Sequence, residues 1–147
     1  MNPRVLVLCT GNAARSQMAE GLLRHLAGGR VEVASAGTRP STVHPLAVRA
    51  MAERGIDISG QRSKPVAEMA GREFDWVITV CDHAAESCPV FPGASRRLHW
   101  SLPDPAAVEG DEDERFDAFR EVRGALEERF RIWWMGVCRE EDASREV

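Results

Sequence analysis

The sequence has no long apolar stretch, no excess of positive charge and only one lysine, Lys64. Its longest apolar runs, 5–9 and 132–137, are too short to span a membrane. With 19 basic and 23 acidic residues the formal net charge is −4, and dispersed arginines carry nearly all the positive charge, which argues against a nucleic-acid surface. Only 12 glycines and 8 prolines exclude collagen-like or low-complexity sequence, and 44% apolar residues exclude disorder.

A length of 147 residues is typical of one compact domain, so we expect a single domain over 1–147. Too few apolar residues follow Met1 for a signal peptide, which predicts a cytoplasmic protein. In that reducing compartment the cysteines are not expected to form structural disulfides, which leaves catalysis, metal binding or inert burial. The four are Cys9, Cys81, Cys88 and Cys138. No pair of cysteines or histidines has the close spacing of a zinc site, so no metal is predicted.

Strand-like and helix-like patterns alternate along the chain. Short β-branched runs predict strands at 5–8, 31–36, 76–80 and 97–100. Apolar residues spaced by three and four predict helices at 16–27, 45–54 and from about 112 onward, with a possible short helix near Val66. This order predicts an α/β fold with a parallel sheet, and the charged tail 139–147 is expected to fray.

The segment from Cys9 to Ser16 joins the first strand to the first helix and reads C-x₅-R-S. Free amides and the positive dipole at a helix N-terminus form a cradle for a tetrahedral oxyanion. Small residues let the backbone curl, Asn12 tolerates a left-handed conformation, and Arg15 supplies a planar charged fork. The predicted oxyanion loop therefore comprises Thr10, Gly11, Asn12, Ala13, Ala14, Arg15 and Ser16.

Cys9 stands at the base of this loop. The loop amides, the helix dipole and the Ser16 hydroxyl favour its thiolate form, and a thiolate beneath a bound oxyanion is a nucleophile. The alternative is a buried thiol at a strand end, with Arg15 an unrelated surface residue.

Cys81 and Cys88 follow the third predicted strand. Its carboxyl end lies on the same rim of a parallel sheet as Cys9, and a thiol near an oxidised adduct can displace it as a disulfide. Cys88 is then the natural resolving thiol. Since a disulfide needs Cα atoms about 4.4–6.8 Å apart, a helix over 82–87 would have to unwind partly to join Cys81 to Cys88.

The oxyanion loop resembles the C-x-G-N-x-x-R-S pattern of the low-molecular-weight protein tyrosine phosphatase fold, matched at Cys9, Gly11, Asn12, Arg15 and Ser16. Phosphotyrosine phosphatases and thioredoxin-coupled arsenate reductases share that fold. The resemblance implies a single-domain three-layer α/β sandwich around a four-stranded parallel sheet. The later cysteines, the Pro89 after Cys88, His99-Trp100 and Asp104-Pro105 resemble the arsenate reductase branch, over about residues 4–134.

That branch implies a role for each matched residue. Cys9 attacks arsenate, Asp104 protonates the departing oxygen, and Cys81 attacks Cys9 to release arsenite. Cys88 then closes an exposed Cys81–Cys88 disulfide that thioredoxin reduces. We expect no cofactor, a monomer, an arsenate-like or phosphate-like oxyanion as ligand, and thioredoxin as partner.

Two other functions fit the same loop. A phosphatase typically has an aromatic residue after Asp-Pro, whereas Ala106 stands here, and often a second cysteine where this chain has Ala14. A non-catalytic oxyanion or redox sensor would keep the loop without needing Asp104.

Some arsenate reductases hold a potassium ion beneath the loop. Asn12, Glu20 and Ser35 match three of its ligands, but Ser63-Lys64 stands where the fourth, an Asp, would fall. The Lys64 ammonium could replace the cation, or Asn12 and Ser35 could simply brace the loop.

Overall fold

The computed structural model describes residues 2–82, 84 and 96–145. Its centre is a parallel sheet of four strands, as the sequence predicted, and the structure places them in the order β2-β1-β3-β4. The strands are β1 (Arg4–Cys9), β2 (Glu32–Gly37), β3 (Trp76–Thr79) and β4 (Arg96–His99). Strand β1 lies between two neighbours and is buried from Val5 to Cys9, which explains its unbroken apolar run.

The register brings the carboxyl ends of three strands to one rim of the sheet. Cys9 at the end of β1 pairs with Gly37 at the end of β2, and Leu8 pairs with Thr79 at the end of β3. Ligands of open α/β sheets bind outside this rim. The loops that follow β1 and β3 therefore meet where a site is expected.

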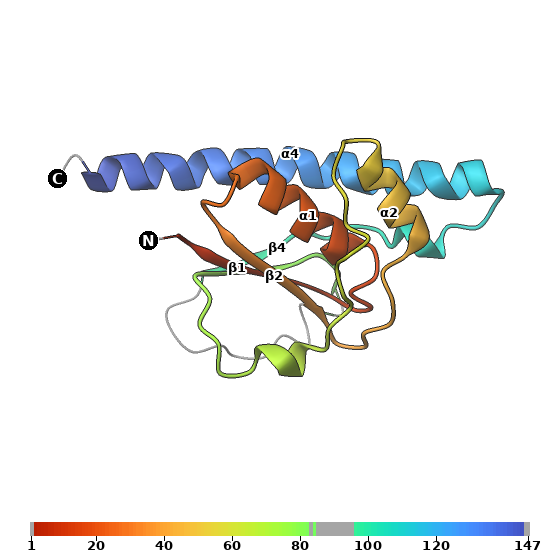
Figure 1. The fold of residues 1–147 in the computed structure, drawn as a ribbon, viewed down its shortest axis with the longest axis horizontal. Coiled ribbons are helices and arrows are strands. Elements are labelled where there is room, and N and C mark those ends of the chain that lie inside the picture. The colour runs from red at the N-terminus through yellow and green to blue at the C-terminus, as the bar shows by residue number, and fades with distance from the viewer. Residues whose placement is uncertain (1, 83, 85–95, 146–147) are drawn as a thin grey trace.

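Helices α1 (Arg15–Ala27), α2 (Pro45–Ala52) and α4 (Glu112–Arg145) cover one face of the sheet, and the short 3₁₀ helix η1 (Val66–Met69) lies on the other (Figure 1). A second 3₁₀ turn, η2 (Pro105–Ala107), precedes α4. The predicted apolar face of α4 supplies the core with Phe119, Leu126 and Phe130, all fully buried. No helix among the described residues is long and apolar enough to cross a bilayer.

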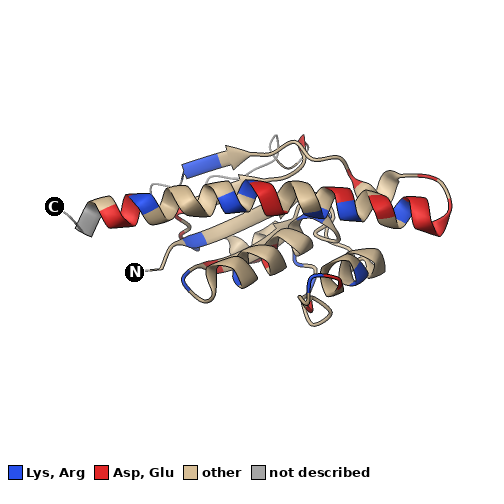
Figure 2. Cartoon of the chain, turned by 90° about the horizontal axis from the view of Figure 1, so that it is seen from above, with Lys and Arg blue, Asp and Glu red and all other residues tan. Residues whose placement is uncertain are grey.

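The end of α4 corrects the expectation of a frayed tail from Arg139, because the helix continues to Arg145. Charged residues of both signs line it (Figure 2). Two of its glutamates reach distant arginines: Glu141 pairs with Arg30 at 3.0 Å and Glu140 with Arg96 at 2.9 Å. Because these partners lie on other elements, the local sequence pattern could not reveal them.

Glu53, just after α2, connects that helix to α4. Its carboxylate accepts hydrogen bonds from Arg120, at 2.7 and 2.9 Å, and from Arg123 at 2.8 Å. The Arg123 side chain is only 7% exposed and also donates to the Ala50 carbonyl at 2.6 Å. The hydrogen bonds from Arg120 and then Arg123 lower the pKa of Glu53 from 4.5 to about 2.

We expect Glu53→Gln to lower the thermal unfolding midpoint at pH 7, because it removes the negative charge beside a buried guanidinium. A carboxyl whose pKa is depressed on folding stabilises the fold above its unfolded pKa, and this contribution is lost as the pH falls towards the folded value. The difference from the parent chain should therefore be full above pH 4.5 and shrink towards pH 2. Thermal melts from pH 7 to pH 3 measure it.

The matched control is Glu128→Gln, which removes an exposed carboxylate on α4, the helix that carries Arg120 and Arg123. It should leave the midpoint unchanged across the range. A Glu53→Gln penalty that stays constant down to pH 3 would show that charge is not its cause.

Candidate active site

The backbone of the oxyanion loop turns its carbonyl groups outward. Segment 38–44 donates to them through Thr38 N to Cys9 O (3.2 Å), Arg39 N to Thr10 O (2.8 Å), Ser41 N to Gly11 O (3.1 Å) and His44 N to Ala13 O (2.9 Å). No acceptor for the amides of Gly11, Ala13 and Ala14 is found within the described chain. Free amides of this kind can bind an anion. Asn12 holds the left-handed conformation, with φ of 46°.

Gly37 supports this loop from the end of β2. A Cβ atom there would lie 2.5 Å from the Thr10 carbonyl oxygen and 2.9 Å from the Asn12 amide nitrogen. Both are backbone atoms, which cannot move without moving the loop. From the sequence, Gly37 was recognisable only as the end of a strand, so this supporting role was missed.

Cys9 is 2% exposed, and its Sγ lies 2.8 Å from Ser16 Oγ and accepts from the Asn12 amide at 3.2 Å. Asn12 Nδ2 donates to Ser16 Oγ at 2.7 Å. Because that hydroxyl oxygen already accepts a hydrogen bond, its own hydrogen is available to the sulfur. The Ser16 hydroxyl and the Asn12 amide thus converge on Cys9 Sγ.

A polar network lies beneath the loop. Asn12 Nδ2 donates to Ser35 Oγ at 2.9 Å, and Ser35 Oγ donates to Glu20 Oε1 at 2.8 Å. Lys64 Nζ lies 3.6 Å from the same Glu20 oxygen, and the Lys64 amide donates to Asn12 Oδ1 at 2.8 Å. The lysine therefore contacts both ends of the network and places a positive charge beside a buried carboxylate.

Arg15 connects the oxyanion loop to residues 100–107, which we call the acid loop. Its side chain is 11% exposed; Nη1 donates to the Leu102 carbonyl at 3.0 Å, and Nη2 lies 4.0 Å from Asp104 Oδ2. Asp104 Oδ1 accepts from the Ala106 amide at 3.0 Å, and the side chain is 47% exposed. One carboxylate oxygen is thus fixed in a turn, while the other faces Arg15.

These groups surround one cavity of about 350 Å³. The residues that line it are Cys9, Thr10, Gly11, Ala13, Ala14, Arg15, Ser41, Thr42, His44, Pro45, Asp104 and Ala106. The structure therefore brings the predicted nucleophile, the predicted acid and most of the oxyanion loop together. Among the lining residues, the sequence analysis missed Ser41, Thr42 and His44.

Cys81 contacts the loop at the residue after Cys9. Its Sγ lies 3.2 Å from Thr10 Oγ1, accepts from the Ala84 amide at 3.3 Å and is buried. A second thiol beside the oxyanion loop is what the relay requires. Cys88, the predicted resolving thiol, lies outside the described residues, as do Pro89 and most of the segment 82–87 that was expected to unwind.

Asp82, the residue after Cys81, is tethered to the end of β4. His99 bonds Asp82 Oδ1 through Nε2 and Thr79 Oγ1 through Nδ1, both at 2.8 Å. The hydrogen bond from His99, followed by one from Ser101, lowers the pKa of Asp82. These contacts hold the backbone beside Cys81 on the sheet.

Residues 4–143 match the family of low molecular weight phosphotyrosine protein phosphatases, and the chain belongs to it. Within this family the chain is similar to several arsenate reductases. The chain is 44% identical over 134 residues to that of Halalkalibacterium halodurans, covering 90% of this chain and 96% of the relative. It is 41% identical over 130 residues to that of Bacillus subtilis, covering 88% and 94%. The chain is therefore a member of the arsenate reductases.

Solved structures of arsenate reductases have the same fold as this chain. An arsenate reductase in a phosphate-binding state superposes with a TM-score of 0.72 at 36% identity, covering 90% of this chain and 96% of that one. A thioredoxin-dependent arsenate reductase of Corynebacterium glutamicum gives 0.74 at 35% identity, covering 95% of this chain and 63% of that one. A tyrosine phosphatase of Erwinia amylovora, at 23% identity and 0.75, covers 92% and 93% and shares the fold.

Proposed function

We propose that this arsenate reductase works by a relay from Cys9 to Cys81 and then to Cys88. The observation that carries the proposal is the buried Cys9 sulfur at the base of an amide-lined cavity, with the Cys81 sulfur on the neighbouring Thr10 hydroxyl. A phosphatase needs only the first of these thiols.

In the first step the loop amides and Arg15 bind arsenate, and the Cys9 thiolate attacks arsenic. An As–S bond forms while an As–O bond breaks. Asp104 gives its proton to the departing oxygen, which leaves as water. This assignment is supported by the position of Asp104 Oδ2, which lies 4.0 Å from Arg15 Nη2 at the cavity that contains Cys9.

In the second step the Cys81 thiolate attacks Cys9 Sγ. An S–S bond forms and the As–S bond breaks, with its electron pair passing to arsenic, so arsenic(V) becomes arsenic(III) and arsenite leaves. Cys88 then attacks Cys81, which frees Cys9 and leaves a Cys81–Cys88 disulfide. We propose that the dithiol of thioredoxin reduces this disulfide, in keeping with the thioredoxin-dependent relative.

We also propose that the Lys64 ammonium takes the place of a metal cation beneath the loop, since it already lies beside the Glu20 carboxylate.

The free thiols of Cys9, Cys81 and Cys138 suit a reducing compartment, so we propose that the protein is cytoplasmic.

The test is consumption of NADPH by the purified chain with arsenate, thioredoxin and thioredoxin reductase. The proposal expects sustained consumption that needs every component. Turnover that persists without thioredoxin would contradict the assignment of the reductant, and absence of arsenite would contradict the relay.

Asp104→Asn should lower the rate of arsenate reduction about 10²-fold or more, because the departing oxygen loses its proton donor. Arsenate should still bind, since the loop amides and Arg15 remain. Steady-state kinetics should therefore show the loss mainly in kcat rather than KM. An unchanged kcat would contradict the assignment of Asp104 as the proton donor.

A further inference from the structure

His44 is fixed to the oxyanion loop through its backbone. Its amide donates to the Ala13 carbonyl at 2.9 Å, and its side chain caps α2, which begins at Pro45. The residue also lines the cavity that contains Cys9, Arg15 and Asp104. A half-buried imidazole thus stands at the proposed oxyanion site, and the proposed mechanism does not use it.

Two sides of the His44 ring are already occupied. Nδ1 accepts a hydrogen bond from the Leu46 amide at 3.0 Å. The ring lies against Phe119, a fully buried residue of α4, with centroids 4.7 Å apart and an angle of 39° between the planes. Within the described part of the chain, Nε2 has no hydrogen-bond partner. Nε2 is therefore available to a ligand, and His44 is one of the residues that line the cavity.

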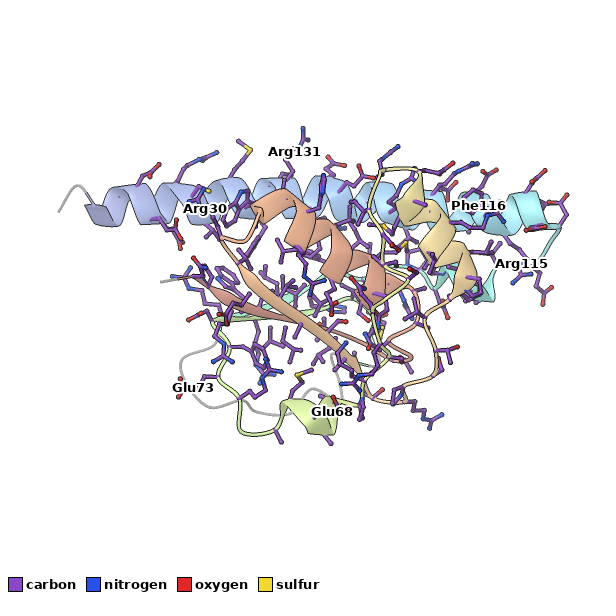
Figure 3. All side chains as sticks on the ribbon, in the orientation of Figure 1. Arg30, Glu68, Glu73, Arg115, Phe116 and Arg131 are labelled. Atoms are coloured by element: carbon purple, nitrogen blue, oxygen red, sulfur yellow. The ribbon has the colours of Figure 1, made fainter. Side chains whose placement is uncertain are left out.

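The surroundings of this imidazole favour its neutral form. Burial, and then the nearby charge of Arg115, lower the pKa of His44, while Asp104 opposes the shift. Arg115 extends from the first part of α4 near α2 (Figure 3), and Arg15 lines the same cavity. A neutral imidazole carries one N–H group. Because Nδ1 accepts from a backbone amide, that hydrogen resides on Nε2.

We propose that His44 is a further oxyanion-binding residue, whose Nε2–H donates to an oxygen of the bound anion at the cavity mouth. The loop amides donate to the oxygens at the base of the cavity. His44 and Asp104 lie on other segments and line the same cavity from outside the loop. The loop amides and Arg15 do not need to bind all four oxygens of an arsenate or phosphate ion. One oxygen can therefore accept a hydrogen bond from His44. The inference rests on the proposed oxyanion site, and inorganic phosphate tests it without any arsenate chemistry.

Two variants separate the three roles of His44. His44→Asn keeps an acceptor for the α2 cap but removes the ring, and His44→Phe keeps a ring against Phe119 but removes the cap. Neither keeps the Nε2–H donor. The measurement is the phosphate concentration that halves the rate of Cys9 alkylation by iodoacetamide, followed on the Cys9 peptide by mass spectrometry.

Both variants should need about tenfold more phosphate than the parent chain, the size expected for a hydrogen bond to a charged acceptor. The alkylation rate without phosphate should stay at the parent value. His25→Asn, an exposed histidine on α1, is the matched control and should need no more phosphate than the parent.

Parent-like protection in His44→Asn would show that only the cap matters, and parent-like protection in His44→Phe that only the ring matters. Either result overturns the proposal. If a variant fails to fold, ¹⁵N spectra of the parent decide: phosphate should shift the Nε2–H signal of His44, and an unmoved signal refutes the contact. Phosphate binding with no arsenate reduction would overturn the relay but not this inference.

Discussion

Cys81→Ser should lose thioredoxin-coupled arsenate reduction by about 10³-fold or more, while its hydrolysis of p-nitrophenyl phosphate stays within about twofold of the parent chain. Reduction needs a second thiolate to take the Cys9 sulfur from arsenic. Ester hydrolysis needs only Cys9, Arg15 and Asp104, which line a cavity that does not include Cys81. A serine hydroxyl can also keep the contact with Thr10, so the loop should stay in place. Steady-state assays of both reactions measure the separation.

Two further cysteine variants serve as controls for this result. Cys9→Ser should lose both activities, because both begin at the same sulfur. Cys138→Ser should lose neither, since Cys138 lies on α4 away from the oxyanion loop. Parent-like reduction by Cys81→Ser would mean that the electrons leave by another route.

Gly37→Ala should weaken phosphate binding and arsenate reduction about tenfold or more, although Gly37 lies outside the oxyanion loop. A Cβ there would overlap the Thr10 carbonyl and the Asn12 amide, so the loop must shift. Catalytic positioning is sensitive to displacements of about 1 Å, which can cost about 10²-fold. Phosphate protection of Cys9 from iodoacetamide measures binding, and the NADPH-coupled assay measures turnover.

Gly11→Ala provides the informative comparison, because Gly11 lies inside the loop. Its nearest contact would be Ser41 Oγ at 3.6 Å, an ordinary van der Waals distance. We expect an effect of threefold or less, in keeping with the small cost of a sterically tolerated substitution. Gly60→Ala, which would meet nothing within 4 Å, controls for the general effect of replacing glycine. Equal losses in Gly11→Ala and Gly37→Ala would contradict the account of loop support.

The sequence was sufficient wherever the determining interactions are local. The apolar run of β1 and the double glycine after α1 fixed those elements, and Gly28 does end α1 in a left-handed conformation with φ of 56°. The C-x₅-R-S spacing between a strand and a helix is also local, and it predicted that Cys9 and Arg15 lie at one site. Chain direction in a parallel sheet then predicted the side on which Cys81 lies.

Features that depend on distant partners could not be predicted. Gly37 is constrained by a loop about 25 residues earlier in the chain, and the last turns of α4 pair with Arg30 and Arg96. His44 was not predicted to belong to the site, because a lone histidine before a proline carries no periodic signal. Its Phe119 contact and its place in the cavity exist only once α2, α4 and the oxyanion loop are packed together.

The central claim is tested most directly by mapping the thiols after the reduced chain meets excess arsenate without thioredoxin. The relay predicts one arsenite released per chain, a disulfide between Cys81 and Cys88, and free thiols at Cys9 and Cys138. Peptide mapping by mass spectrometry identifies the disulfide, and arsenite quantification in the same sample gives the amount released per chain. A final disulfide that includes Cys138, or arsenite released while Cys81 remains a free thiol, would contradict the relay.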